Sequence, residues 1–300
     1  NPHALLGLHQ TAEGKEIRLW RPGAEDVYCK IGDAVKQAEQ IHTEGLFRCV
    51  IPHSFTFLDY RVYHHSGLLA ADPYAFWPTF GEVDQYLFAK GAHYEISRKM
   101  GARVCVHQGV YGVKFTVWAP EAKSVALIAD FNEWDVRYNP MRSLGESGLW
   151  ELFVPGIGVG EKYKFAIETR SGEMLIKSDP YAYAFEKRPS TASIVANVCE
   201  FAWGDEDWLQ KRSQQQWLSS PMNIYEVHTG SWKKRHGEFL NYRELAHELS
   251  AYCQQMGYTH IELLPIQEHP LDESWGTQDC GFYAPTRRHG PEDDSQYLVN

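Results

Sequence analysis

Acidic side chains gather between residues 262 and 273, where paired acid–base chemistry could lie. Glu262 and Glu268 flank the end of an apolar segment, and Asp272 and Glu273 are neighbours on the stretch that follows it. Two carboxyl groups held close together can act as a general acid and a general base, or one of them as a nucleophile. Charged residues on a loop are mostly solvated, however. We therefore expect a solvated loop here and not a catalytic pair.

The histidines and cysteines form no pattern typical of a metal site or an activated nucleophile. His247 and Glu248 lack the second histidine that a His-Glu-x-x-His zinc motif places one helical turn later. We interpret His228 as a hydrogen-bonded core histidine. There is no Cys-x-x-Cys pair, so we expect reduced thiols in a cytoplasmic protein, with neither metal nor cofactor. The cysteines concerned are Cys29, Cys49, Cys105, Cys199, Cys253 and Cys280.

The composition limits the classes of protein to which the chain could belong. Its 300 residues with 43% apolar content suffice for two or three domains with ordinary cores. A net charge of −10 without a basic run argues against nucleic acid as a partner. No apolar stretch approaches the ~18 residues of a membrane span, and no signal peptide is visible, so we predict no membrane partner.

A tandem duplication organises the first two thirds of the sequence. The phrase ADPYAFWP at 71–78 returns as SDPYAYAF at 178–185. Upstream of each copy, IRLWRPGAEDVYCKI from Ile17 pairs with FTVWAPEAKSVALIA from Phe115. The second copy carries an extra loop, DFNEWDVRYNPMR, that the first lacks. In both copies Asp-Pro closes the unit, because a residue before proline is held extended and proline then fixes the exit direction of the chain.

Each copy of the repeat has the pattern of a small β-sandwich. Between residues 114 and 168, the segments KFTVW, SVALIA, LWELFV and KYKFAIE have strand length and are rich in β-branched and aromatic residues. Turns with Gly, Pro and charged residues separate them. Several short strands at this spacing indicate an antiparallel sandwich of roughly 80–100 residues.

A different pattern begins at residue 222. MNIYEVHTG (222–230) and YTHIELLPI (258–266) are apolar strands, and we expect the second to be buried on both faces. The helix between them can begin at Asn241, with Glu244 completing a capping box, and end before Gly257. The long crossover implies that the two strands are parallel. A further helix is expected from Pro291.

The chain resembles the bacterial glycogen branching enzymes, which are 1,4-α-glucan branching enzymes of the α-amylase family. The resemblance spans essentially all 300 residues. Single motifs occur across the α-amylase family, but EVHTGSW, EHPLDESWG and YAPTRR together are specific to the branching enzymes. The motifs of the first two thirds are NPHALLG at 1–7, VWAPEAKSV at 117–125, DFNEWDVRYNPMR at 130–142 and SDPYA at 178–182.

This resemblance implies a multidomain fold. Two tandem immunoglobulin-like β-sandwiches of the carbohydrate-binding-module type would be followed by the first two βα units of a (β/α)8 barrel. The implied boundaries are 1–95 for the first module, 96–190 for the second, glycogen-binding-like module, 191–221 for a linker and 222–300 for the start of the barrel, which is incomplete.

The implied reaction belongs to glycogen biosynthesis. An α-1,4-glucan chain is cleaved with retention, and the segment is transferred to a 6-hydroxyl to form an α-1,6 branch. The family's catalytic carboxylates are expected beyond Asn300, so we name no catalytic residue in this chain and expect it to be inactive alone. The implied partner is glycogen or a linear α-1,4-glucan, and a monomer is expected. The alternatives are a non-catalytic glucan-binding fragment, or a debranching or trehalose-releasing relative.

The resemblance also implies sugar contacts on the loop after the second strand of the barrel. Trp275, Gln278 and Arg288 are candidates for the wall of the sugar site, with plain packing as the alternative. The family usually has Ser-Trp-Gly-Tyr-Gln here, and its tyrosine stacks on glucose at the cleavage point. This chain has Thr277 at that position, so the stacking ring is absent unless Trp275 or Tyr283 supplies it.

A second set of implied contacts lies in the second sandwich. Related glycogen-binding modules hold sugar with a tryptophan on an Asn-x-Trp turn and a lysine on a Tyr-Lys-Phe strand, and Trp134 and Lys164 match these positions. A further aromatic residue expected in the next hairpin is Met174 here. The first copy has Arg61 in place of the lysine and no counterpart of the Trp134 loop. We therefore predict a structural first copy and leave the second open between weak glucan binding and packing.

Overall fold

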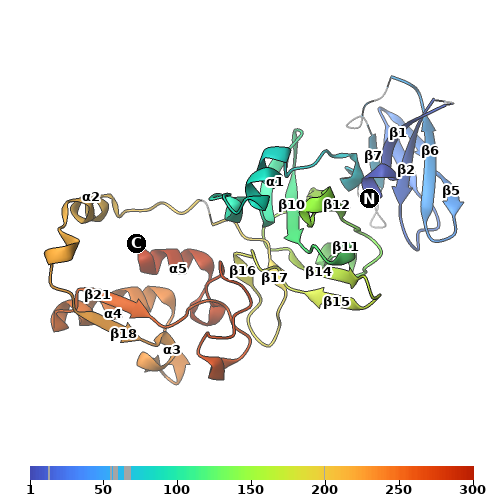
Figure 1. Ribbon diagram of the computed structural model, residues 1–300. Coiled ribbons are helices and arrows are strands. Elements are labelled where there is room, and N and C mark those ends of the chain that lie inside the picture. The colour runs from blue at the N-terminus through green and yellow to red at the C-terminus, as the bar shows by residue number, and fades with distance from the viewer. Residues whose placement is uncertain (13, 55, 57–59, 64–68, 199) are drawn as a thin grey trace. The chain divides into compact units, whose positions relative to one another are not determined.

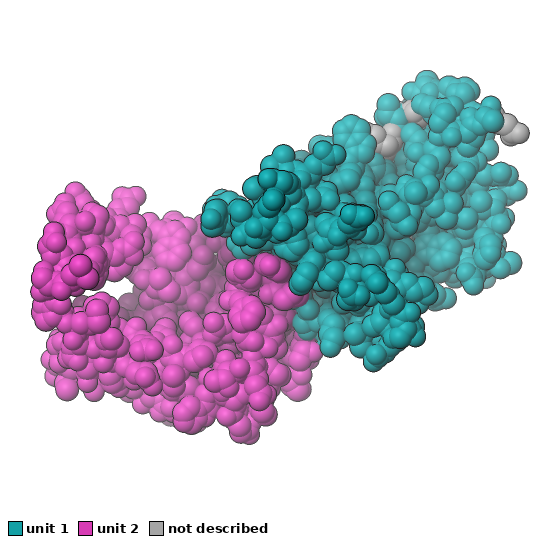
Figure 2. Space-filling model, in the orientation of Figure 1, with its two compact units in different colours: residues 1–179 teal, residues 180–300 magenta. Residues whose placement is uncertain are grey.

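The structure is a computed structural model of the 300-residue chain and divides into two compact units, residues 1–179 and 180–300 (Figure 2). The division falls inside the second Asp-Pro-Tyr phrase, whereas the sequence placed the end of the second module at residue 190. In the described ranges, no helix is both long and apolar enough to cross a membrane. The structure describes all residues except 13, 55, 57–59, 64–68 and 199, so Cys199 lies outside the described residues.

The first copy of the repeat forms two four-stranded antiparallel sheets, ordered β1-β2-β6-β5 and β4-β3-β7-β8 (Figure 1). Ile17, Leu19 and Phe47 of one sheet pack with Cys29 and Val62 of the other in a single buried cluster. A core closed between two sheets is a β-sandwich. The strands are β1 (Gly7–Thr11), β2 (Gly14–Trp20), β3 (Tyr28–Ile31), β4 (Ala34–Gln37), β5 (Glu39–His42), β6 (Leu46–Ile51), β7 (Tyr60–Tyr63) and β8 (Leu69–Ala70).

The second copy repeats this arrangement. One sheet has the order β12-β13-β10-β9, and in the other β11 and β15 flank β14. Phe115 of β10 and Tyr163 of β14 join the two sheets edge to face, with ring centroids 5.0 Å apart. The strands predicted from the sequence are present; the elements are α1 (Glu82–Ala89), β9 (Gly101–His107), β10 (Val110–Trp118), β11 (Ala122–Ala129), β12 (Arg142–Ser143), β13 (Leu149–Pro155), β14 (Lys162–Thr169) and β15 (Met174–Lys177).

The repeated Asp-Pro-Tyr phrase has the same structural task in both copies. The hydroxyl of Tyr60 donates to Asp72 Oδ2 over 2.9 Å, and that of Tyr163 donates to Asp179 Oδ2 over 2.6 Å. All four side chains are buried. Asp72 also accepts from the backbone N–H of Tyr74. A buried carboxylate is costly without hydrogen-bond donors. Each aspartate therefore needs its tyrosine, on β7 in the first copy and on β14 in the second.

The second unit contains the expected strand–helix–strand element. β18 (Ile224–Val227) and β21 (His260–Leu263) pair in parallel, and α4 (Tyr242–Met256) connects them (Figure 1). The capping box of Asn241 and Glu244 is present, and Gly257 ends the helix with φ of 77°. These observations confirm the predicted helix with both of its ends. The remaining elements are α3 (Thr229–Trp232), β19 (Lys234–Arg235), β20 (Glu238–Phe239) and the expected α5 (Glu292–Val299).

One expectation for the second unit is corrected by the structure. β21 is not buried on both faces, since Ile261 is 41% exposed and Leu263 is only half-buried. Two strands with one crossover helix cannot cover both faces of a parallel sheet. The stretch 191–221, predicted as a linker, contains β17 (Ser193–Ile194), which pairs with β16 (Ala184–Phe185), and α2 (Glu206–Gln214).

We predict that Tyr60→Phe lowers the free energy of unfolding of the first unit by about 2 kcal/mol, because the buried Asp72 carboxylate then loses a hydrogen-bond donor. Burial raises the pKa of Asp72 above its ordinary value, and the charge of Arg21 and the Tyr60 hydrogen bond oppose this rise. Because the hydrogen bond favours the ionised carboxylate, the loss should grow as the pH rises through the pKa of Asp72. Urea unfolding followed by circular dichroism measures the loss at each pH.

The matched control is Tyr28→Phe on β3. Tyr28 is 38% exposed, and among the described residues its hydroxyl has no hydrogen-bond partner. We expect this change to stay within about 0.5 kcal/mol of the parent. Equal losses in the two variants would refute the special role of the buried pair.

Candidate functional site

The extra loop of the second copy is held in shape by a buried asparagine. Asn132 Oδ1 accepts from Ala129 N over 2.8 Å, and Asn132 Nδ2 donates to Leu127 O over 2.9 Å and to Asn139 Oδ1 over 2.7 Å. Asn132 is 7% exposed. Because both ends of the loop are tied to this one side chain, the turn between them is fixed before any ligand arrives.

The turn presents Trp134. Glu133 and Trp134 have φ of 56° and 60°, a left-handed conformation that non-glycine residues seldom adopt. Such strained residues cluster at functional sites. The indole Nε1 of Trp134 donates to Asp130 Oδ1 over 2.9 Å, and the side chain is 36% exposed. The ring is therefore oriented by the protein while part of its surface remains open to a ligand.

Lys164 lies at the same end of the β11–β14 pair as Trp134. It is opposite Ile128 in the antiparallel register, and Trp134 N donates to Ala129 O, one residue further along β11. Lys164 is half-buried. Met174 is paired with Glu168, which lies four residues from Lys164 on β14. At about 3.3 Å per residue, Glu168 is roughly 13 Å from Lys164 along the strand. The structure thus groups Trp134 with Lys164 and sets Met174 apart.

The first sandwich supports the Trp134 loop from outside. Trp20 Nε1 donates to Arg137 O over 2.6 Å, and Tyr74 OH donates to Pro140 O over 3.0 Å. Tyr138 of the loop donates in return to Pro22 O over 3.0 Å. Sequence reasoning missed these contacts, because each joins residues that are more than sixty positions apart. Their only signal was the insertion itself, which occurs in one copy and needs support.

The loop after β21 presents Trp275 beside His228. Trp275 is 59% exposed, with its ring centroid 5.4 Å from that of His228. Gly276 follows with φ of 84°, and a Cβ there would lie 2.3 Å from Pro265 O, so only glycine allows this approach. His228 follows β18 directly, and its Nδ1 lies 2.9 Å from Ser231 Oγ, which confirms the predicted hydrogen bond. It is only half-buried, which corrects the expectation that it lies in the core. Burial lowers the pKa of His228, and the nearby His269 lowers it further.

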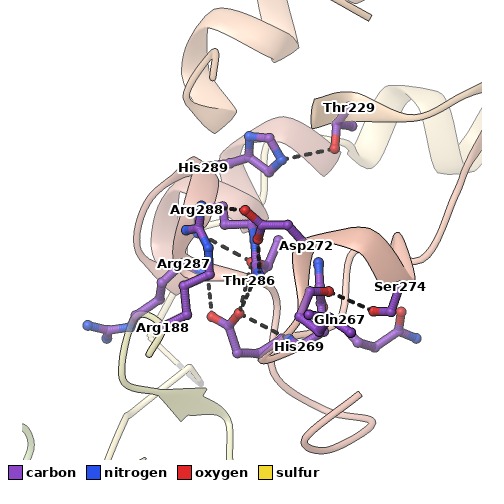
Figure 3. A network of polar contacts seen from close by, with 12 residues as sticks. Arg188, Thr229, Gln267, His269, Asp272, Ser274, Thr286, Arg287, Arg288 and His289 are labelled. Atoms are coloured by element: carbon purple, nitrogen blue, oxygen red, sulfur yellow. Dashed lines mark hydrogen bonds and ion pairs between the residues drawn. The ribbon is translucent and has the colours of Figure 1, made fainter. Parts of the chain in front are cut away.

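Arg288 lies in a polar network and not on an open wall (Figure 3). Its side chain is 5% exposed, and Nη1 is 2.7 Å from Glu268 Oε1, while Nε is 2.8 Å from Asp272 Oδ1. Arg188 approaches the other oxygen of Asp272 at 2.6 Å. The predicted role of Arg288 as a sugar contact therefore stays a prediction, and these partners favour the packing alternative.

Glu268 is buried at the centre of this network. It is 2% exposed and accepts from Thr286 Oγ1, Arg287 N, His269 N and Arg288 Nη1. The expectation of a solvated loop is therefore wrong for Glu268, although Glu262 and Glu273 are exposed. Both oxygens of this carboxylate are thus engaged in holding the loop.

Gln278 and Thr277 are exposed on the same loop as Trp275. The hydroxyl of Thr277 donates to Ser274 O over 2.6 Å and so closes the turn. Tyr283, the other candidate ring, is stacked on Tyr181 with centroids 5.2 Å apart. Of the two rings proposed to replace the missing tyrosine, Trp275 is the more exposed.

His289 is buried in the second unit. Its Nδ1 lies 2.8 Å from Leu240 O, to which it donates, and its Nε2 lies 3.0 Å from Thr229 Oγ1, whose hydroxyl can donate to a neutral ring. Burial lowers the pKa of His289, and the charge of Arg288 adds to the effect. A folded-state pKa below the unfolded value of about 6.5 means that the unfolded chain binds the proton more readily.

We predict that the contribution of His289 to the stability of the second unit is fully present above about pH 6.5 and is lost as the pH falls below that value. In His289→Gln the slope of the urea midpoint against pH between 7 and 5 should be smaller than in the parent chain, because glutamine does not titrate. His236→Gln, at an exposed position, is the control and should keep the parent slope. An unchanged slope in His289→Gln would contradict the assignment.

Comparisons with known proteins agree with the duplicated architecture. Residues 1–74 match the N-terminal domain of alpha-1,4-glucan branching enzyme GlgB, and residues 99–182 match carbohydrate-binding module 48, the isoamylase N-terminal domain. Among solved structures, the match to a Salmonella typhimurium protein assigned to the alpha amylases covers 67% of this chain and 30% of that protein, with a TM-score of 0.52 and 24% identity. The match to an Anoxybacillus pullulanase solved with maltotriose covers 95% of this chain and 43% of the pullulanase, with a TM-score of 0.50 and 18% identity. These two likenesses concern the fold alone.

Curated relatives match the chain from end to end. The 1,4-alpha-glucan branching enzyme GlgB of Protochlamydia amoebophila is 61% identical over the whole chain, which covers 42% of that protein. The Chlamydia felis enzyme of the same name is 48% identical, with 41% covered. The chain thus spans about two fifths of the length of these relatives. With a branching-enzyme N-terminal domain, a carbohydrate-binding module and this identity throughout, the chain belongs to the family of the 1,4-alpha-glucan branching enzymes.

Proposed function

We propose that the chain serves glycogen branching by holding α-1,4-glucan on its second sandwich. The observation that carries this proposal is the exposed Trp134 ring, which Asp130 orients on a turn that Asn132 locks. A flat, pre-oriented ring with a lysine at the same strand end suits a sugar, because the C–H face stacks on the ring while a cation meets the hydroxyls. Sugar is bound here without the cost of ordering the loop.

The complete reaction is a retaining transfer of a glucan segment to a 6-hydroxyl, in a cytoplasmic, monomeric enzyme that needs no cofactor. The parallel β18–β21 pair would begin the catalytic (β/α)8 barrel, in which active sites lie at the carboxyl ends of the strands. Trp275 and Gln278 stand after β21 at that end. Later strands of the barrel would supply the nucleophile and the acid/base, since Glu268 is engaged in its own network.

We predict that Trp134→Ala strongly reduces the retardation of the chain in a glycogen affinity gel. Losing one ring–sugar stack should cost on the order of 1–3 kcal/mol, by analogy with base–aromatic stacking, which is a large part of a millimolar affinity. The control is Trp208→Ala on α2, where another tryptophan is 55% exposed. Unchanged retardation in Trp134→Ala would move the glucan site elsewhere in the chain.

We also predict that this chain can replace its counterpart in an active relative. A chimera of residues 1–300 with the remainder of the Protochlamydia amoebophila branching enzyme should create α-1,6 linkages in amylose, measured by debranching the product and sizing the chains. The chain alone should give no new linkages above a buffer control. A folded chimera that binds glycogen without branching amylose would count against the branching role.

A further inference from the structure

A cavity of about 630 Å³ lies within the first unit, where the first sandwich meets the second. The first copy contributes Arg21, Arg61 and Tyr74 to its wall, and the second contributes Tyr111, Tyr138 and Asn139. This volume is within the range of small-molecule sites, about 300–1,000 Å³. Trp134 does not line the cavity, so the cavity is separate from the glucan surface proposed above.

The aromatic walls of the cavity are rigid. Tyr74 is 5% exposed and its hydroxyl is bound to Pro140 O, while the hydroxyl of Tyr138 is bound to Pro22 O. Both rings are therefore fixed by hydrogen bonds that cross between the sandwiches. Tyr111 adds a third ring, which is 51% exposed. Fixed rings provide flat apolar surface at little entropic cost to a ligand that has its own flat C–H faces.

A free donor lies on the wall of this cavity. Asn139 is 9% exposed, and its Oδ1 is occupied by Asn132 Nδ2. Its amide nitrogen has no hydrogen-bond partner among the residues that the structure describes. Because this nitrogen is not sealed from solvent, it is a donor that a ligand in the cavity can reach.

The charged side chains on the cavity wall are of both signs. Arg21 is close enough to the buried Asp72 to oppose the rise that burial causes in the pKa of that carboxyl, and Arg61 and Glu133 line the cavity with opposite charges. An ionic ligand would meet a charge of its own sign here, whereas a polyhydroxyl ligand could donate to Glu133 and accept from the Asn139 amide. The mixed charges favour a neutral ligand rich in hydroxyl groups.

We propose that this cavity is a second carbohydrate site that takes a short neutral α-glucan oligosaccharide. The inference rests on the proposed glucan function for its choice of ligand, but not on the Trp134 surface. The loop that carries Trp134 also contributes Phe131, Asn132, Glu133, Tyr138 and Asn139 to the wall of the cavity. Oligosaccharide in the cavity would hold the two sandwiches together at the loop that presents Trp134.

The test uses the whole chain with Trp134→Ala as background, so that only the cavity remains to bind. Maltotetraose is titrated and followed by saturation-transfer NMR, and we expect residual millimolar binding. Adding Ile157→Trp, which places a large ring on the cavity wall, should abolish it. Adding Val159→Trp in the same loop should not, because Val159 is 61% exposed and does not line the cavity. Urea midpoints verify that both variants fold.

A second variant removes the free donor without filling space. Asn139→Asp keeps an oxygen for Asn132 and replaces the unpaired amide by an acceptor, so binding should weaken at least tenfold. Inorganic phosphate should not compete with maltotetraose; competition would overturn the neutral ligand. No residual binding in the Trp134→Ala background, or binding that Ile157→Trp leaves intact, would overturn the cavity site while leaving the Trp134 surface standing. If maltotetraose fails to bind even the parent chain, both proposals fall.

Discussion

The hydrogen bond between a buried tyrosine and a buried aspartate is the constraint on which the first unit depends. Tyr60 with Asp72, and Tyr163 with Asp179, place a carboxylate at zero to 1% exposure, which is tolerable only because a hydroxyl is aimed at it. The bond fixes where the chain leaves each sandwich. In the first copy that exit leads directly to Tyr74, which reaches across to Pro140 in the second copy. A local pairing inside one sandwich thereby sets the relation between the two.

The two copies of the repeat share one fold but differ in the loop that presents an aromatic ring. Both copies retain the paired sheets and the closing phrase, yet only the second carries the inserted loop with Asn132 and Trp134. The first copy supports this loop through Trp20 and Pro22 instead of presenting a loop of its own. A turn with two successive left-handed residues is strained and needs such support, because only contacts with the surrounding structure keep it in this conformation. Binding capacity in one copy thus depends on structure in the other.

In the second unit, charged side chains organise a loop in place of forming a catalytic pair. Glu268 gathers donors from Thr286, Arg287 and Arg288, and Arg288 in turn fixes Asp272. Breaking one member of such a buried network leaves an uncompensated charge, so the network acts as a unit. Its effect is to hold the loop after β21 so that Trp275 stays exposed beside His228. The acidic residues support the position of the aromatic ring, and the ring is the part available to a ligand.

The sequence by itself determined what depends on neighbouring residues. Strand periodicity located β10, β11, β13 and β14, and the cap residues Asn241 and Gly257 located both ends of α4, because these signals act within a few positions of the chain. The internal repeat also showed that Asp72 and Asp179 are equivalent positions, although the tyrosine hydrogen bond that each accepts is seen only in the structure. Only the tertiary structure decided that Glu268 and Arg288 are buried together, that β21 is exposed, and that Tyr74 and Asn139 line a common cavity. Burial and cavities arise from contacts between residues far apart in the chain, and no local pattern encodes which distant side chain will satisfy a given charge or leave a given amide free.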